Sequence, residues 1–285
     1  YADIVSGSPK ATNPSAEEPL KQAGGVVVLS GANPHGTPLL DVYGTAAKAL
    51  AGTAVAAGDF DGQPGVEVIV GAPLDNDPVT ERRGVGSVKI YTVNNPMWID
   101  AQYGDAAKDY FGKAVAAGAD VDNDGVTDVL VGAPGLDNPA NKKLKDIGGV
   151  VVLYGSSGGS LQRSEPLLGS EPKSGLGSAV VLGDVNGDGF AELIAGAPKG
   201  DSPTTPKITR DTGSVMLWNG DGFAPLTPLY GEKKGGLFGA SVSAGDINSD
   251  GRLVIIIGIP GFDLPTASKP IKDAGKVTVV NGMGF

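Results

Sequence analysis

The stretch that decides the fold is Asp120-Val121-Asp122-Asn123-Asp124-Gly125-Val126-Thr127-Asp128, which continues into Val129-Leu130-Val131-Gly132-Ala133-Pro134. Side-chain oxygens stand at positions 1, 3, 5 and 9 of this acidic turn, and a glycine stands at position 6. A calcium ion takes about six to eight oxygen ligands, and alternating acidic side chains on a tight turn can supply them. The stretch therefore predicts a calcium-binding turn between two β-strands.

The Gly-x-Pro element at the end of this stretch recurs along the whole chain. Copies begin at Gly7, Gly71, Gly132, Gly196 and Gly258, at intervals of 64, 61, 64 and 62 residues. An even period of this length is typical of a repeat architecture. We therefore expect one structural unit to occur about five times.

The order of segments within one period indicates four short strands. Around Gly132 we expect a strand of small residues over 111–118, the acidic turn, a second strand over 128–133, a third over 148–155 and a short fourth segment ending at 169. Such strands, separated by turn residues and with no helical spacing of apolar residues, favour antiparallel β-structure. Four strands per repeat predict an all-β fold, a β-propeller of four-stranded antiparallel blades. A β-sandwich is the alternative, although it would not repeat its sequence so evenly.

The repeats predict a single domain over residues 1–285 with about five blade equivalents. The first repeat starts in its second strand and the fifth ends after its third strand. We therefore expect an incomplete ring, or one that a partner segment or further blades complete. The chain starts at Tyr1 in the middle of the pattern, so we also expect that a leader has been removed.

The acidic turn occurs four times, in phase with the repeat. The predicted metal ligands are Asp59, Asp61, Gln63, Gly65 and Glu67 in the first acidic turn (59–67), Asp120, Asp122, Asp124, Val126 and Asp128 in the second (120–128), Asp184, Asn186, Asp188, Phe190 and Glu192 in the third (184–192), and Asp246, Asn248 and Asp250 in the fourth (246–254). The residue at position 7 offers only its backbone carbonyl, which calcium accepts.

The four turns differ in the strength of the predicted site. Val254 replaces the ninth-position acid of the fourth turn, and Arg252 adds a positive charge beside it. We therefore expect three strong calcium sites and a weak or empty fourth. The alternative is that Asp, Asn and Gly only form turns. The repetition favours the metal, because clustered carboxylates without a cation repel one another. The spacing is shorter than that of an EF-hand loop, and magnesium is a weaker candidate because it prefers to keep its waters.

Composition excludes several classes of function. The net charge of −10 argues against binding to nucleic acid, and no apolar run is long enough to span a membrane. Cysteine is absent, so thiolate metal sites and disulfides are excluded. The single histidine, His35, is beside Pro34 and reads as a loop residue, and no nucleophile elbow or phosphate-binding loop occurs. We therefore expect no catalytic residues and no enzymatic activity.

Within each repeat we call the connection between the second and third strands the 2–3 loop, and the connection from the fourth strand to the first strand of the next repeat the 4–1 loop. Because successive strands run in opposite directions, these loops are expected on the face opposite the acidic turns, which join the first and second strands. These loops hold basic residues, which are Arg82, Arg83, Lys142, Lys143, Lys145, Lys207, Arg210, Lys269 and Lys272 in the 2–3 loops and Lys48, Lys108, Lys173, Lys233 and Lys234 in the 4–1 loops. We expect a comparatively basic face that binds a protein or glycan partner, because loops on a rigid scaffold commonly carry binding sites. The alternative is that these lysines are only solvated. Trp98 and Trp218 are candidate rings for stacking on a sugar, but each is near a strand, so core packing is the stronger expectation.

The repeat resembles the FG-GAP repeat of the integrin alpha-subunit β-propeller. Phe111-Gly112 and Phe238-Gly239 match the FG element, Leu176-Gly177 and Ala51-Gly52 match it more weakly, and Gly-Ala-Pro occurs at 71–73, 132–134 and 196–198. The resemblance implies propeller blades, calcium at the 1–2 hairpins and a secreted or cell-surface location.

The resemblance also orders the possible functions. The first hypothesis is a calcium-stabilised, non-catalytic module for cell adhesion or protein–protein interaction. A lectin-like, carbohydrate-binding propeller is the second. An accessory domain of a larger phospholipase-type enzyme is the third, and it would require a separate catalytic domain.

Overall fold

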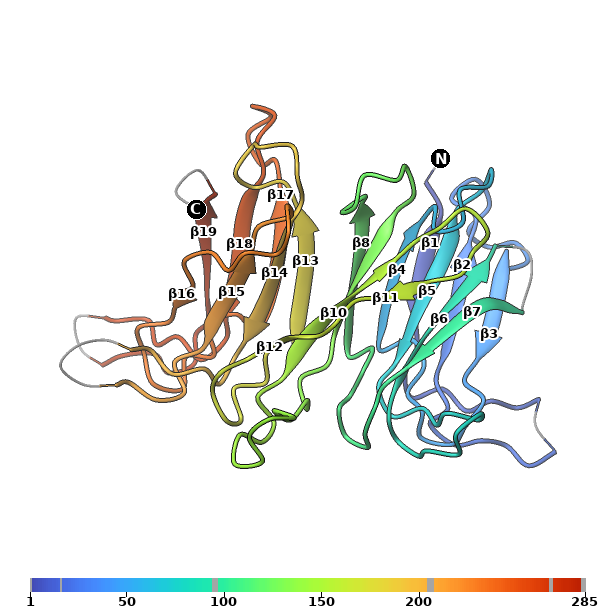
Figure 1. Ribbon diagram of the computed structural model, residues 1–285, viewed down its shortest axis with the longest axis horizontal. Coiled ribbons are helices and arrows are strands. Elements are labelled where there is room, and N and C mark those ends of the chain that lie inside the picture. The colour runs from blue at the N-terminus through green and yellow to red at the C-terminus, as the bar shows by residue number, and fades with distance from the viewer. Residues whose placement is uncertain (1, 16, 94–96, 204–207, 267–268, 283–285) are drawn as a thin grey trace. The chain divides into compact units, whose positions relative to one another are not determined.

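The computed structural model describes residues 2–15, 17–93, 97–203, 208–266 and 269–282. The regular secondary structure within these ranges consists of β-strands, arranged in five small antiparallel sheets (Figure 1). The prediction of an all-β fold built from repeated blades is confirmed. Each sheet corresponds to one repeat, and we number the sheets along the chain.

The first and fifth sheets have three strands, the second and fourth have four, and the third has five. The strands, sheet by sheet, are β1 (Ile4–Gly7), β2 (Gly25–Leu29) and β3 (Leu40–Tyr43); β4 (Ala54–Gly58), β5 (Glu67–Ala72), β6 (Ser87–Thr92) and β7 (Trp98–Tyr103); β8 (Ala114–Ala119), β9 (Asp128–Gly132), β10 (Gly149–Tyr154), β11 (Gln162–Arg163) and β12 (Leu167–Leu168); β13 (Ala179–Gly183), β14 (Glu192–Ala197), β15 (Ser214–Trp218) and β16 (Leu229–Tyr230); and β17 (Ser241–Gly245), β18 (Val254–Ile259) and β19 (Lys276–Asn281).

The register places each acidic turn at the tip of a 1–2 hairpin. In the second sheet Gly58 pairs with Glu67, and in the fourth Gly183 pairs with Glu192. The ninth-position acid is thus the first residue of strand two and lies at the base of its turn. In the third sheet the register shifts between Ala117 and Ala119, and Ala119 pairs with Asp128. The hairpins therefore bring the two ends of each acidic turn together.

The chain forms two compact units. The first unit comprises residues 1–133 and 151–165, and the second comprises residues 134–150 and 166–285. In the first unit, Val68 and Val70 of β5 pack with Val26 and Val28 of β2. In the second unit, apolar residues of β14 and β15 pack with β18. Because side chains alternate across a strand, Val68 and Val70 of β5 share one face of the second sheet.

The FG element joins neighbouring blades. Each residue preceding the FG glycine forms a parallel bridge to a glycine that precedes strand three of the preceding sheet, and the pairs are Gly24–Ala51, Gly86–Phe111, Gly148–Leu176 and Gly213–Phe238. Phe111 and Leu176 are each only 1% exposed. The first strand of the third sheet accordingly begins at Ala114 rather than at 111 as predicted, because Phe111 and Gly112 belong to the junction.

The GAP glycine completes the same junction. A Cβ atom added to Gly71 would lie 2.2 Å from the carbonyl oxygen of Gly112, and one added to Gly196 would lie 1.9 Å from that of Gly239. Both distances are far below a van der Waals contact, so only glycine fits. The repeat motif is therefore a contact between the backbones of successive blades.

The 2–3 and 4–1 loops hold acids as well as the predicted cations, and three of those cations are neutralised by ion pairs. Arg82 pairs with Asp77, Lys145 with Asp137 and Lys233 with Asp263. Lys207 lies outside the described residues. Charge attraction alone therefore does not identify the partner of this face.

The two tryptophans differ from each other in exposure. Trp218 is 6% exposed, as core packing requires, whereas Trp98 is 43% exposed, so the expectation that both are core residues is wrong for Trp98. Trp98 opens β7, and one face of its ring lies 4.9 Å from the Lys89 ammonium nitrogen. In the part of the chain that the structure describes, no helix has the length and apolarity that crossing a membrane requires.

Candidate metal sites

The acidic turns share one backbone scaffold, in which aspartate and asparagine oxygens accept local N–H groups. In the second turn, the Gly125 N–H donates to Asp120 Oδ2 at 2.8 Å and the Val126 N–H donates to Asp124 Oδ1 at 2.8 Å. In the third turn, Gly189 and Phe190 donate to Asp184 and Asp188 in the same way. These bonds curl the chain so that the odd-numbered side chains converge.

Left-handed backbone conformations make the curl possible. Asn123 at position 4 has φ 60° and Gly125 at position 6 has φ 92°. Glycine and asparagine adopt this region more readily than other residues do. The glycine at position 6, which the sequence pattern singled out, thus shapes the turn.

Two of the turns bring three carboxylates together. In each, one oxygen from every member lies within 4.8 Å of the others, and the members are Asp59, Asp61 and Glu67 in the first turn and Asp120, Asp122 and Asp124 in the second. Asp128 is fully buried behind the second cluster. Gln63 and Gly65 line an open hollow beside the first cluster. The oxygen-only donor set and its spacing fit a hard divalent cation.

In the third turn an amide bridges the acids. Asn186 Nδ2 donates to Asp188 Oδ2 and to Glu192 Oε1, each at 3.0 Å. The predicted ligands Asn186, Asp188 and Glu192 are therefore together, but a nitrogen stands between the carboxylates. The Asn186 Oδ1 accepts the Asp188 N–H at 2.8 Å, so turning the amide to present its oxygen to a cation would cost this bond. Among the described residues, clusters of three converging carboxylates occur in the first and second turns and not in this one.

The fourth turn keeps the scaffold without the closing acid. The Gly251 N–H donates to Asp246 Oδ2 at 2.8 Å, and Asn248 Nδ2 donates to Asp250 Oδ2 at 2.9 Å. Val254 stands at the base of the hairpin, where the other three turns have an acid. The site has only two carboxylates, which is consistent with the expectation that it is the weakest.

The ninth-position acid has a role that the sequence pattern did not reveal. It accepts the N–H of position 2, from Phe60 to Glu67 at 3.0 Å, from Val121 to Asp128 at 2.6 Å and from Val185 to Glu192 at 2.9 Å. This acid therefore ties the start of the turn to strand two. The bracing role thus falls on a side chain that the sequence pattern predicted as a metal ligand.

Burial and mutual repulsion perturb these acids. Burial, aided by the charges of Asp122 and Asp120, raises the pKa of Asp128 to about 6. Burial likewise raises the pKa of Glu67, with Asp61 and Asp59 adding to the effect, and that of Glu192. Negative charge in these turns is thus held at a cost that a bound cation would offset.

The first sheet contributes one more acid, which the sequence reading missed. Asp3 lines the hollow beside the first cluster, together with Asp61 and Gln63. It precedes Gly7 by four residues, as Asp128 precedes Gly132. Its Oδ1 accepts the Gly31 N–H at 3.0 Å, as Asp128 Oδ1 accepts the Gly155 N–H at 2.9 Å. The repeat register could have identified Asp3 as a ninth-position acid.

Family comparison places the second, third and fourth acidic turns within a known repeat. Residues 176–216 and 238–280 match the FG-GAP repeat, and residues 120–195 match the FG-GAP-like repeat. The chain carries FG-GAP repeats. Their relation to the integrin alpha subunits, which the FG and GAP elements suggested, is also found in direct comparison.

Three relatives illustrate how distant the similarity of this FG-GAP chain is. Integrin alpha-8 of Gallus gallus is 32% identical over 171 residues, which cover 59% of this chain and 15% of the relative. Integrin alpha-2 of Mus musculus is 31% identical over 245 residues (77% and 19%), and integrin alpha-IIb of Mus musculus is 31% identical over 220 residues (74% and 20%). The chain thus spans at most a fifth of the length of these relatives.

Solved structures give a looser likeness. The computationally designed Ika8 protein aligns with 92% of this chain and 54% of its own, at 15% identity and a TM-score of 0.48, which is too low to carry an argument. The assignment to FG-GAP repeats therefore stands on the repeat matches and on the five antiparallel sheets.

Proposed function

We propose that the first three acidic turns each bind a calcium ion, and that the two compact units together act as one domain, a calcium-stabilised, non-catalytic binding module. The observation that carries the proposal is the convergence of three carboxylates within 4.8 Å at the tips of two hairpins of an FG-GAP repeat protein. When bound, calcium would neutralise these charges and cross-link strands one and two. Calcium fits better than magnesium because backbone carbonyls at position 7 complete its larger ligand shell.

Calorimetric calcium titration, with thermal unfolding in calcium and in chelator, tests this proposal. We expect three ions per chain and a large rise in melting temperature with calcium. Asp124→Ala should remove one ion, whereas Asp41→Ala, which removes an exposed acid on β3, should leave the stoichiometry unchanged. Equal melting temperatures in calcium and chelator would contradict the proposal.

The binding face of the proposed module is the one that carries the 2–3 and 4–1 loops. Support comes from a backbone bond repeated in three sheets, in which Lys48, Lys108 and Lys173 of the 4–1 loops donate their N–H groups to the carbonyls of Lys21, Gly84 and Lys145. Loops fixed in this way lose little entropy on binding. The similarity to integrins favours a protein partner in cell adhesion and a secreted or cell-surface location.

Adhesion assays on immobilised extracellular matrix proteins test the binding face. Lys108→Glu and Lys173→Glu should weaken any adhesion that the wild-type protein supports. Asp221→Lys, in a 3–4 loop on the opposite face, is the control and should not. Loss of adhesion in the control alone would contradict the proposal, because it would place the partner on the face that carries the 3–4 loops.

Carbohydrate binding is a second candidate, because Trp98 is exposed. Its ring meets Tyr91 edge-on, with centroids 6.4 Å apart, and leaves surface free for stacking on a sugar. A glycan array tests this candidate. Binding that Trp98→Ala abolishes would favour a lectin, and an array without signal would count against it.

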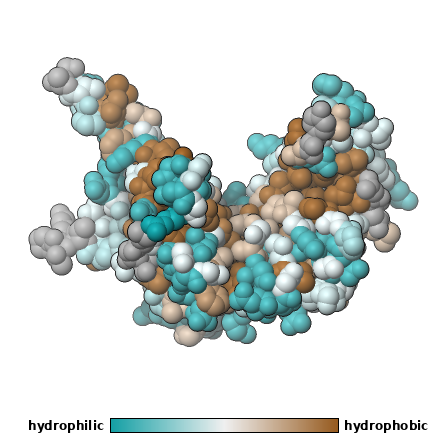
Figure 2. Space-filling view, turned by 90° about the horizontal axis from the view of Figure 1, so that it is seen from above, coloured by the Kyte–Doolittle hydropathy of each residue, from teal (hydrophilic) through white to brown (hydrophobic). Residues whose placement is uncertain are grey.

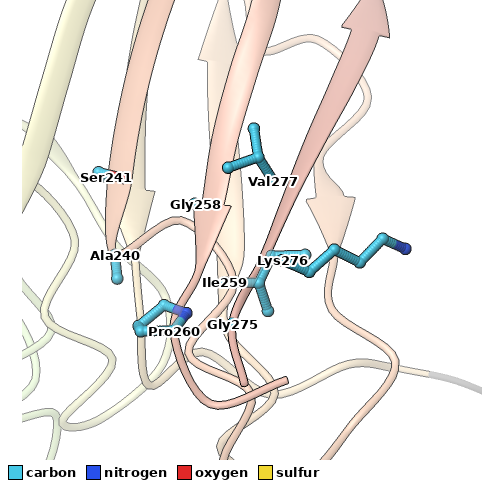
Figure 3. Close-up of a pocket in the computed structure, with 8 residues that line it drawn as sticks. All are labelled: Ala240, Ser241, Gly258, Ile259, Pro260, Gly275, Lys276 and Val277. Carbon is cyan, nitrogen blue, oxygen red and sulfur yellow. The ribbon is translucent and has the colours of Figure 1, made fainter. Parts of the chain in front are cut away.

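The fifth sheet supports the expectation that a partner segment or further blade completes the ring. Gly258 is the GAP glycine of this sheet, and the nearest atoms to a Cβ added there belong to Ser241 of the same sheet rather than to a following FG glycine. A groove lies over it, lined by Ala240, Ser241, Pro260 and Val277 (Figure 3). Figure 2 shows that the protein exposes apolar as well as polar surface. On the fifth sheet, Val277 and Val279 are 64% and 49% exposed. We propose that another blade of the same repeat type packs on this face.

A further inference from the structure

The backbone of the first acidic turn is held by residues of the third sheet. Three consecutive carbonyl oxygens, those of Asp59, Phe60 and Asp61, accept the N–H groups of Thr127 at 2.8 Å, Ser156 at 3.4 Å and Gly158 at 3.1 Å. All of these residues belong to the first unit. They fix positions 1 to 3 of the first turn, which include two of its three clustered carboxylates.

Two of these donor residues, Thr127 and Ser156, are also connected to the second acidic turn. Thr127 is position 8 of that turn, and Asp128 at position 9 accepts the Gly155 N–H, one residue before Ser156. Val126 at position 7 is 6% exposed, and its Cγ2 lies 3.5 Å from a Cβ added to Gly62 in the first turn. Two peptide segments, 126–128 and 155–158, therefore connect the backbones of the two turns, so that fixing the conformation of one turn helps to fix that of the other.

We propose that the first and second calcium sites form one coupled pair, in which calcium at either turn tightens binding at the other. The proposal rests on the proposed function, since it presumes that both turns bind calcium. Calcium at the second turn fixes residues 126–128, and the first turn then binds its ion with part of its backbone already ordered. Ordering that one ligand causes and a second ligand uses gives positive cooperativity without a change of fold. Coupling of this kind typically amounts to about 5- to 150-fold in affinity.

Calcium titration followed by the amide resonances of two glycines tests the coupling. The Gly62 N–H donates to Asp59 and reports the first site, and the Gly125 N–H donates to Asp120 and reports the second. Asp124→Asn removes a ligand charge but keeps the oxygen that accepts the Val126 N–H, so the turn is preserved. We expect the calcium midpoint at Gly62 to rise by about 5-fold or more in Asp124→Asn.

Two further variants make the result decisive. Asp61→Asn keeps the oxygen that accepts the Gln63 N–H, and by reciprocity it should raise the midpoint at Gly125 as well. The matched control is Asp188→Asn in the second unit, which should leave the midpoint at Gly62 unchanged.

The outcomes separate the coupling from calcium binding itself. If Gly62 and Gly125 titrate in the wild type but Asp124→Asn leaves Gly62 unaffected, or if only one of the two reciprocal variants has an effect, the coupling is overturned. If neither glycine responds to calcium in the wild type, the proposed function fails first.

Discussion

The substitution Glu67→Gln should change stability in opposite directions with and without calcium. Glu67 is 3% exposed and stands within 4.8 Å of Asp59 and Asp61. Glutamine keeps an oxygen for the Phe60 N–H and removes the charge. Without calcium, the variant loses a repulsion and the burial of a charge. With calcium, it loses a charged ligand.

The magnitudes follow from the geometry. Two unit charges 4.8 Å apart repel by about 3 kcal/mol at an effective dielectric of about 20. Because the turn tip is solvated, we expect about half of that, so the calcium-free variant should be more stable than the wild type by about 1–2 kcal/mol. Calcium at about 1,000 times its dissociation constant stabilises by about 4 kcal/mol, and a 100-fold weaker site reduces this to about 1.4 kcal/mol. The calcium-induced rise in melting temperature should then shrink by about 5–10 °C.

Urea and thermal unfolding in chelator and in calcium measure both effects. A variant that is less stable than the wild type in chelator would refute the idea that the carboxylates repel one another. Asp128→Asn provides the contrast, because both of its oxygens accept N–H groups, from Val121 and Gly155. Its amide nitrogen must face one of these donors, so this variant should be less stable in chelator as well, by about 1–3 kcal/mol.

Three further predictions concern the fourth turn, pH and a buried ion pair. Val254→Glu should restore the missing closing acid and raise the calorimetric stoichiometry by one ion, whereas Val254→Gln should not. The pKa of Asp128, raised to about 6, predicts that calcium affinity falls as the pH drops through 6, because the proton competes with the ion. Without calcium, the same raised pKa favours folding at low pH, and this contribution to stability is lost as the pH rises through 6. Melting temperatures measured with and without calcium should therefore change with pH in opposite directions. Changing Lys89, which pairs with the buried Asp75 at 2.8 Å, to Met should lower stability by about 3–5 kcal/mol. Adding Asp75→Leu should recover only part of that loss in urea unfolding, because the buried Ser87 hydroxyl then loses its acceptor.

The repeated elements were predictable because they are local. The acidic turns, the strands beside them and the sheet composition follow from spacing along the chain, and β1 and β19 are found in the incomplete sheets where the pattern placed them. Asp3 was equally predictable, because it lies four residues before Gly7, as the ninth-position acids lie four residues before their own GAP glycines. It was not predicted because the other positions of an acidic turn do not precede it in this sequence.

Contacts between repeats could not be predicted in the same way. The bond from Thr127 to Asp59 joins residues that are far apart in the chain, and nothing in their types marks them as partners. Trp98 was misjudged for a related reason. Proximity to a strand does not say which face of the strand is covered, and Trp98 begins a fourth strand, where less of the sheet is covered. The sequence period defines the repeat, whereas the packing of neighbouring strands and repeats decides which side chains are exposed.

The junction between blades has an evolutionary consequence. Gly71 and Gly196 meet the next blade through its backbone carbonyl, and the bridge from Gly86 to Phe111 is likewise made by main-chain atoms. A joint built from main-chain atoms is the same whatever side chains surround it. The main-chain part of the joint can therefore stay the same when blades are duplicated or deleted, and only the apolar side chains packed between the sheets must match. The glycines that look like simple spacers in the sequence are what allows the number of blades to vary.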